Sequence, residues 1–139
     1  GIVLDAEGGA LEKMLTPFRF FLGGPVGSGR QWMSWIHRRD EVAAMVHCIE
    51  HSQCQGAYNF TAPKPVTNKQ FCSALAKALK RPCWLPAPAF ALKALLGEMA
   101  EELLLGGQKT LPRRLQQSGY TFIFPDLHDA LQDIMQRMQ

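Results

Sequence analysis

The chain of 139 residues carries a net charge of +3, and 47% of its residues are hydrophobic while 19% are charged. This composition is typical of a folded globular protein, and the length suits one domain or part of a larger one. The cations form dispersed pairs, which argues against nucleic-acid binding, and the apolar stretches contain Pro and Lys and are too short to cross a membrane.

The chain opens with a short apolar segment. Ile2–Leu4 predicts a buried strand that is entered from its middle, and Gly1 is not an initiator residue, so we expect a fragment of a longer protein. After a turn over residues 5–9, the helical spacing of apolar residues from Leu11 to Phe18 predicts a helix that Pro17 kinks or ends.

A glycine-rich loop over residues 23–29 precedes a predicted strand over residues 31–36, with Gln31, Met33 and Trp35 on one face. The glycines do not fit a dinucleotide-binding turn, because Pro25 interrupts them and a strand follows where a helix is required. We interpret this loop as structural or as lining a substrate pocket.

The middle of the chain predicts two helices. Asp40 is the expected N-cap of the first, whose inward stripe is Val42, Met45, Val46 and Ile49, and a strand over residues 57–61 follows it. Thr67 and Gln70 predict a capping box at the start of the second. Its expected inner face is Phe71, Ala74, Leu75, Ala78 and Leu79.

The last third predicts a short strand over residues 83–85, helices over residues 88–97 and 98–105, and a final helix capped by Asp126. The final helix has the expected inner residues Leu127, Ala130, Leu131, Ile134 and Met138. Strands that alternate with helices indicate an α/β fold.

The cysteines suggest a reducing environment. Cys48, Cys54, Cys72 and Cys83 form no CxxC pair, so we expect free thiols and a cytoplasmic location.

Three histidines are candidate site residues. His47 and His51 have the spacing of a zinc pair, but surface histidines beside a packed cysteine are the favoured interpretation, with no metal. His37, at a strand-to-helix junction, either fixes the turn by hydrogen bonds or acts as an acid or base.

Residues 23–43 read GGPVGSGRQWMSWIHRRDEVA. They resemble the GGPxGxGxQxxSWIHxxD block of extended short-chain dehydrogenases/reductases, in the epimerase family often labelled as nucleoside-diphosphate-sugar epimerase-like. The resemblance continues through residues 58–63, 65–67, 111–112, 119–120, 122, 126–127 and 130–131. It therefore covers nearly the whole chain.

The resemblance implies that residues 1–139 form a single C-terminal, substrate-binding part of an extended Rossmann-type, NAD(P)-binding α/β fold. The parent protein would be an NAD(P)-dependent sugar-nucleotide epimerase, hence an isomerase, or an oxidoreductase. Relatives carry their glycine-rich NAD(P) turn and catalytic Tyr-x-x-x-Lys further upstream, and neither Tyr58 nor Tyr120 is followed by Lys four residues on. The fragment alone is therefore expected to be inert, to bind no NAD(P) and to self-associate.

The resemblance also implies site residues. Ile2 and Val3 are expected near the nicotinamide, and the expected substrate-binding residues are Gln31, Met33, Arg113 and Arg114. Met33 stands where sugar-nucleotide epimerases commonly place an Arg that holds the diphosphate, so Arg30 or one of Arg113 and Arg114 is a candidate substitute. The expected partner is a small molecule, such as a nucleotide-sugar. The alternative is a non-catalytic regulatory or protein-interaction module on the same fold.

Overall fold

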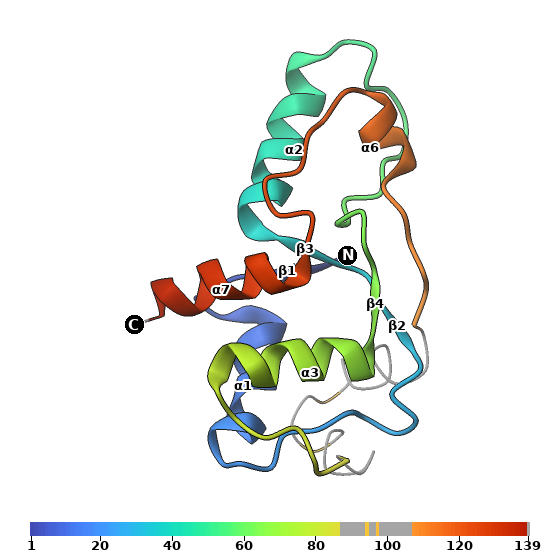
Figure 1. Cartoon of the computed structure of the whole chain (residues 1–139). Coiled ribbons are helices and arrows are strands. Elements are labelled where there is room, and N and C mark those ends of the chain that lie inside the picture. Colours follow the sequence, from blue (N-terminus) through green and yellow to red (C-terminus); the bar gives the residue numbers. More distant parts are fainter. Residues whose placement is uncertain (87–93, 95–96, 98–106, 139) are drawn as a thin grey trace.

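The computed structural model describes residues 1–86, 94, 97 and 107–138 (Figure 1). Two pairs of short strands lie at its centre. β1 (Ile2–Leu4) pairs in parallel with β3 (Trp35–His37), and β2 (Trp32–Met33) pairs antiparallel with β4 (Val66–Thr67). Parallel strands need a long crossover between them, and the crossover from β1 to β3 contains α1 (Gly9–Arg19).

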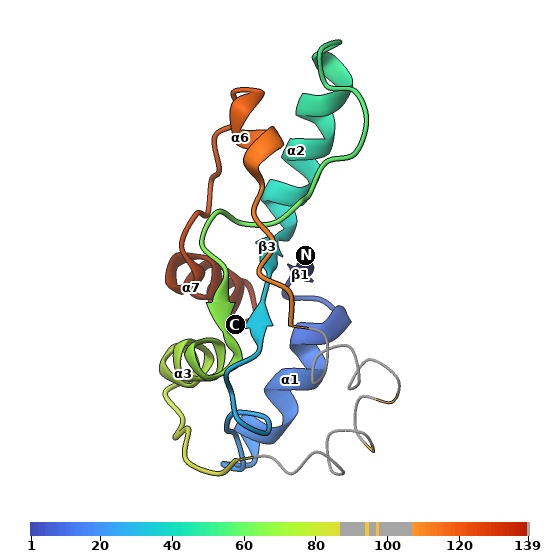
Figure 2. The same ribbon diagram turned by 90° about the vertical axis from the view of Figure 1, so that its right-hand side faces the viewer.

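Four further helices surround these strands: α2 (Arg38–Glu50), α3 (Asn68–Leu79), α6 (Arg113–Gln117) and α7 (Leu127–Arg137). Figure 2 shows α3 and α7 on one side of the strands and α1 on the other, whereas α2 and α6 extend away toward the top of the view. The described residues therefore form an α/β arrangement with its main core between three helices and the strands.

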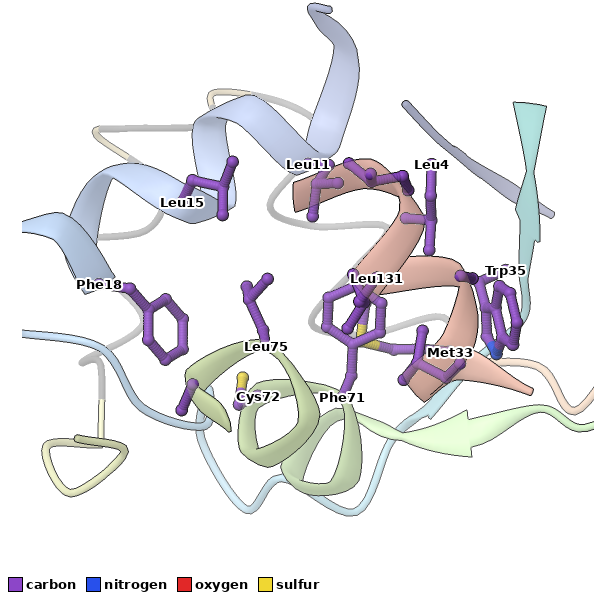
Figure 3. Close-up of a cluster of buried hydrophobic side chains, with 14 of the residues drawn as sticks. Leu4, Leu11, Leu15, Phe18, Met33, Trp35, Phe71, Cys72, Leu75 and Leu131 are labelled. Carbon is purple, nitrogen blue, oxygen red and sulfur yellow. The ribbon is translucent and has the colours of Figure 1, made fainter. Parts of the chain in front are cut away.

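The core is built from the apolar faces of these elements (Figure 3). Its members include Leu4, Leu11, Leu15, Phe18, Met33, Trp35, Phe71, Leu75 and Leu131. α3 packs against α7, and α1 packs against β1, so residues from both ends of the chain share one interior. Burial of these side chains is the main source of stability, at about 25 cal/mol per Å² of apolar surface.

Several predicted elements are confirmed. The strand Ile2–Leu4 forms, and Thr67 and Gln70 make both hydrogen bonds of a capping box at the start of α3. The final helix buries four of its five expected inner residues, Leu127, Ala130, Leu131 and Ile134, while Met138 is partly buried against the same core.

The predicted single strand over residues 31–36 is wrong in one respect, because Ser34 divides it into two strands of different sheets. Before Ser34 the chain pairs with β4, and after it the chain pairs with β1. Met33 and Trp35 are buried together as expected, but Ile36 on the opposite face is buried as well, since α2 packs against β3.

Two predicted strands do not form. Residues 57–61 are without a ladder partner, although the neighbouring Ala62 N–H donates to the carbonyl of Trp35. Residues 83–85 likewise make no ladder, and the Trp84 N–H donates a single bond to Gly23 O. Isolated backbone bonds hold both segments, and β-propensity alone does not supply a paired strand.

The start and the inward face of α2 also differ from the prediction. The N-cap is His37, whose Nδ1 accepts the Arg39 N–H at 3.1 Å, whereas Asp40 lies within the first turn and is fully buried. The predicted inward stripe Val42, Met45, Val46 and Ile49 is exposed, with Ile49 at 82%. The buried residues of α2 are Asp40 and Ala44, so the apolar stripe faces away from the core.

At the other helix ends the structure adds detail. Pro17 lies inside the last turn of α1, which continues to Arg19, and α6 was not predicted. Asp126 precedes α7 but makes no capping bond, because its carboxylate binds Lys64 Nζ at 2.8 Å. The helices predicted over residues 88–97 and 98–105 lie outside the described residues, apart from positions 94 and 97.

Candidate functional site

An open groove of about 590 Å³ lies beside the strands. We call it the 59–113 groove, and it is lined by Asn59, Gln108, Lys109, Thr110, Leu111 and Arg113. Two segments that are distant in sequence form its walls: the segment leading to β4 and the segment leading to α6, which lie side by side in Figures 1 and 2. The Thr61 hydroxyl, which donates to Thr110 O at 3.5 Å, links them.

Ser34 fixes the groove to the strands. Its hydroxyl donates to Gln108 O at 2.8 Å and accepts the Thr110 N–H at 3.0 Å, so one side chain holds two residues of the wall. The Ser34 carbonyl accepts the Ile2 N–H at 2.7 Å. Ser34 lies between β2 and β3, where its hydroxyl both donates to and accepts from the groove wall. Its carbonyl binds β1, so this residue sets the position of the groove relative to β1.

The charged side chains of the groove are both cations. Lys109 and Arg113 line it, and no carboxylate is among the lining residues that the structure describes. Lys109 Nζ lies 4.5 Å from the ring centroid of Trp32, which keeps the ammonium close to the wall. Amide groups of Asn59 and Gln108 add neutral donors. This combination suits an anionic ligand that also offers hydrogen-bond acceptors.

The two arginines predicted for substrate binding lie in different surroundings. Arg113 lines the groove. Arg114 instead donates to Ala57 O at 2.6 Å and to Gln55 O at 2.7 Å, and its guanidinium lies 4.6 Å from the ring of Tyr58. Arg114 thus holds the loop that follows α2, and a role for it in substrate binding stays a prediction.

Gln31 and Met33 are not among the groove residues. The Gln31 amide donates to Val26 O at 3.0 Å. Met33 is 2% exposed within the core, and its sulfur accepts from Asn68 Nδ2 at 3.3 Å. Arg30, one of the candidate substitutes for the phosphate-binding Arg, is exposed to solvent. Contacts of these residues with substrate stay predictions.

The two predicted cofactor residues lie at the start of β1, where Ile2 is half-buried and Val3 is 40% exposed. The glycine-rich loop over residues 23–29 leads into β2 and not into a helix. Its Gly24 is covered, because a Cβ there would overlap the Leu85 carbonyl, and Cys72 Sγ donates to Gly24 O at 3.4 Å. The described residues therefore do not fit a cradle for a dinucleotide diphosphate, which needs open glycine backbone before a helix.

Comparison with known proteins gives the relationship. An epimerase family protein from Arabidopsis thaliana, the chloroplastic SDR39U1 homolog, is 48% identical over 98% of this chain, and the matched part is 39% of that protein. The SDR39U1 protein of Bos taurus is 44% identical over 97% of the chain and is matched over 46% of its length. Residues 87–134 also match the family described as a domain of unknown function, DUF1731.

Solved structures agree with this. The crystal structure of human epimerase family protein SDR39U1 with NADPH superposes with a TM-score of 0.89 at 40% identity, covering 98% of this chain and 46% of that one. A nucleoside-diphosphate sugar epimerase from Corynebacterium glutamicum gives a TM-score of 0.67 at 27% identity, covering 97% of this chain and 25% of that one.

The chain is therefore similar over nearly its whole length to the C-terminal part of proteins of the epimerase family of extended short-chain dehydrogenases/reductases. It spans less than half the length of the curated relatives given above and corresponds to their C-terminal part. Its fold is the C-terminal part of the Rossmann-like arrangement of this family.

The SWIHxxD block of the family contains three polar residues with defined positions, Ser34, His37 and Asp40. Asp40 is fully buried, and its carboxylate accepts the Tyr120 hydroxyl and the N–H groups of Ile123 and Phe124, each at 2.8 Å. This carboxylate therefore ties the first turn of α2 to the segment before α7. Burial and the bond to Asp40 raise the pKa of Tyr120 above its ordinary value.

His37 occupies the neighbouring position in the same block. Nδ1 accepts the Arg39 N–H, and the other nitrogen, Nε2, lies 3.1 Å from Asp133 Oδ2 and 3.2 Å from Arg137 Nη2. Arg137 Nε binds the same oxygen at 2.9 Å. Burial lowers the pKa of His37 despite the opposing effect of Asp133. The imidazole fixes the turn, as one of the two sequence-based alternatives proposed.

Sequence reasoning missed the partners of this block. Gln108, Tyr120 and Asp133 lie 74, 80 and 96 residues beyond Ser34, Asp40 and His37. The SWIHxxD block could have indicated that such partners exist, because polar residues among buried apolar neighbours require hydrogen-bond partners.

His47 and His51 pack against each other at the end of α2. The rings of His47 and His51 stack at 4.0 Å between centroids, and His47 Nε2 lies 3.1 Å from Ser118 O. Across residues 1–86 and 107–138, no group of three or more His, Cys, Asp or Glu is arranged to hold a metal ion. Within the same residues, no helix has the length and apolar content needed to cross a bilayer.

Proposed function

We propose that this chain is the substrate-side region of an NAD(P)-dependent sugar-nucleotide epimerase or oxidoreductase, and that the 59–113 groove binds an anionic part of the substrate. The observation that carries this proposal is the pair of cations, Lys109 and Arg113, in a groove whose described lining includes no acid. A pyrophosphate gains charge-assisted hydrogen bonds from such groups. A related nucleoside-diphosphate sugar epimerase of known structure supports this substrate class.

The cofactor would be NAD(P), held by residues outside this chain. NADPH is present in the human relative of known structure, and the described residues here do not fit a diphosphate cradle. Ile2 and Val3 remain our candidates for contact with the nicotinamide, because β1 begins beside Ser34 and thus near the groove wall. Nicotinamide supplies hydride chemistry when bound.

We further propose that residues 1–139 form one region that requires a Rossmann portion for activity and is inert alone. Two features support this. Among the described residues the parallel sheet has only the two strands β1 and β3, and the stripe of Val42, Met45, Val46 and Ile49 is exposed to solvent. The Arabidopsis relative is described as chloroplastic, and the cytoplasmic location expected for this chain stays a prediction.

The test uses the full-length protein and a UDP-sugar, with binding followed by calorimetry. Arg113→Gln and Lys109→Gln should each weaken binding by roughly 1.5–3 kcal/mol, the range for a hydrogen bond to a charged group. The control is Lys69→Gln, which changes an exposed cation outside the groove lining and should leave the affinity unchanged.

Nicotinamide absorbance is recorded in the same samples. Turnover that falls in the two groove variants supports an enzyme. UDP-sugar binding with neither an epimerised sugar product nor net oxidation or reduction of nicotinamide would favour the non-catalytic module instead. Equal affinity of wild type and both groove variants would show that the groove is not the anion site.

A further inference from the structure

Lys109, one of the two cations of the 59–113 groove, lies against an aromatic ring. Its side chain is exposed, and its Nζ is 4.5 Å from the ring centroid of Trp32, a half-buried residue of β2. A cation at this distance from an indole face is attracted by the electrons of the ring. A lysine side chain is long and loses conformational entropy when it is ordered. The Trp32 ring therefore holds this cation at the groove wall in the protein without ligand.

The backbone around Lys109 is fixed to the same part of the sheet. The Ser34 hydroxyl binds backbone groups of both sequence neighbours of Lys109, at 2.8 Å and 3.0 Å. Gly107 packs directly on β2, because a Cβ at Gly107 would lie 2.5 Å from Trp32 N and 2.8 Å from Trp32 O. Glycine permits this close approach of two backbone segments because it has no Cβ. The side chain of Lys109 thus starts beside the ring that its ammonium contacts.

The second cation of the groove has a different support. Arg113 is the first residue of α6, whereas Lys109 lies in the segment that is bound to Ser34 and β2. A substitution of Trp32 should therefore act on Lys109 and leave Arg113 in place. It also leaves the charge of Lys109 unchanged, so the position of this cation and its charge can be altered separately.

We propose that Trp32 is a positioning residue of the 59–113 groove, which holds the Lys109 ammonium where it meets the anionic part of the substrate. This inference rests on the proposed binding of an anion in the groove. Trp32 acts through Lys109, because a side chain that is ordered before the ligand arrives loses less conformational entropy on binding. The affinity of the groove for an anion should therefore depend on an aromatic face at position 32.

The test is calorimetry of a UDP-sugar with the full-length protein. Trp32→Leu should weaken binding about two- to fivefold, the size expected from the loss of an exposed cation–π contact. Trp32→Phe keeps an aromatic face and should restore most of the affinity. Trp84→Leu is the matched control, because it makes the same change at an exposed tryptophan outside the groove lining, and it should leave the affinity unchanged.

A double-mutant cycle separates positioning from a general effect on the fold. In the Lys109→Gln background, Trp32→Leu should cause no further loss of affinity, because the side chain that Trp32 positions is absent. Equal losses in the two backgrounds, or tighter binding by Trp32→Leu alone, would overturn the proposal. Unchanged affinity in both Lys109→Gln and Arg113→Gln would instead refute the anion site of the proposed function, and this inference with it.

The wild-type protein provides a measurement that does not depend on the folding of a Trp32 variant. Protons above an indole face resonate upfield in NMR spectra, because the ring current shields them. The ε-methylene protons of Lys109, assigned by their loss in Lys109→Gln, should therefore lie upfield of those of the exposed Lys69. The upfield shift should persist when the UDP-sugar is bound. Its loss on binding would show that the ligand draws Lys109 away from the ring, which contradicts the proposal.

Discussion

Individual side chains in this protein connect segments that are distant in sequence. Asp40 accepts three hydrogen bonds from residues 120–124, and Ser34 makes two with residues 108–110. His37 makes one local and one distant contact, as the N-cap of α2 and as a hydrogen-bond partner of Asp133. Buried polar groups need such partners, because each unsatisfied group costs roughly 1–3 kcal/mol.

At this scale, the stability of the fold should depend on pH through His37. Its pKa is lowered by burial, so the folded state favours the neutral imidazole. As the pH falls below about 6.5, the unfolded chain takes up the proton first, and the stability that neutral His37 contributes is lost through the lower pKa of the folded state. The free energy of unfolding in urea should therefore fall between pH 7 and pH 5.

His37→Asn keeps an N-cap acceptor but cannot be protonated, so its stability should fall less over the same pH interval. His128→Asn, at an exposed position on α7, is the matched control and should follow the wild type. Asp5 affects stability in a lower pH range. Burial would raise the pKa of Asp5, but the ion pair with Arg38 lowers it, so the stability that the ionised carboxylate contributes is lost only below about pH 3.9. Identical pH slopes for wild type and His37→Asn would contradict the assignment.

At the scale of elements, local signals worked where the chain supplies its own partners. The capping box of α3 uses Thr67 and Gln70, three residues apart, and both of its bonds form. The start of α2 differs from the prediction, because Asp40 makes tertiary hydrogen bonds and His37 is the N-cap. Helix periodicity located α2 but not its buried face.

Thr67→Ala should lower the free energy of unfolding by about 1 kcal/mol, because it removes the side-chain acceptor for the Gln70 N–H. Thr16→Ala in the last half of α1 is the matched control. Its hydroxyl makes only a 3.4 Å bond to Glu12 O, and Ala has the higher helix propensity, so this change should be neutral or slightly stabilising. Equal losses in the two variants, measured by urea denaturation, would show that the cap contributes nothing specific.

At the scale of the whole molecule, the described surface exposes apolar side chains on α2 and β1. The stripe on α2 and the 40% exposed Val3 of β1 present hydrophobic groups to solvent. Exposed patches of this kind usually mark contacts with another surface. In the proposed parent protein that surface would be the Rossmann portion.

The chain of residues 1–139 by itself should consequently self-associate, which sedimentation velocity over a range of concentrations would show. Val46→Lys and Ile49→Lys place charges on the stripe and should shift the species toward monomer. Gln53→Lys adds the same charge at an exposed polar position and should not. A strictly monomeric wild-type chain at high concentration would argue against a large missing partner surface.

The resemblance to the epimerase family, the α/β class and the elements with local signals could all be predicted from the sequence. Those elements are β1, the cap of α3 and the inner face of α7. Tertiary structure decided the rest, since strand pairing and burial depend on what lies opposite. It left residues 57–61 and 83–85 unpaired, turned the α2 stripe outward and brought Asn59 beside Lys109 and Arg113. Ser34 and His37 form hydrogen bonds with residues that lie 74 and 96 positions further along the chain, and no local sequence pattern encodes such contacts.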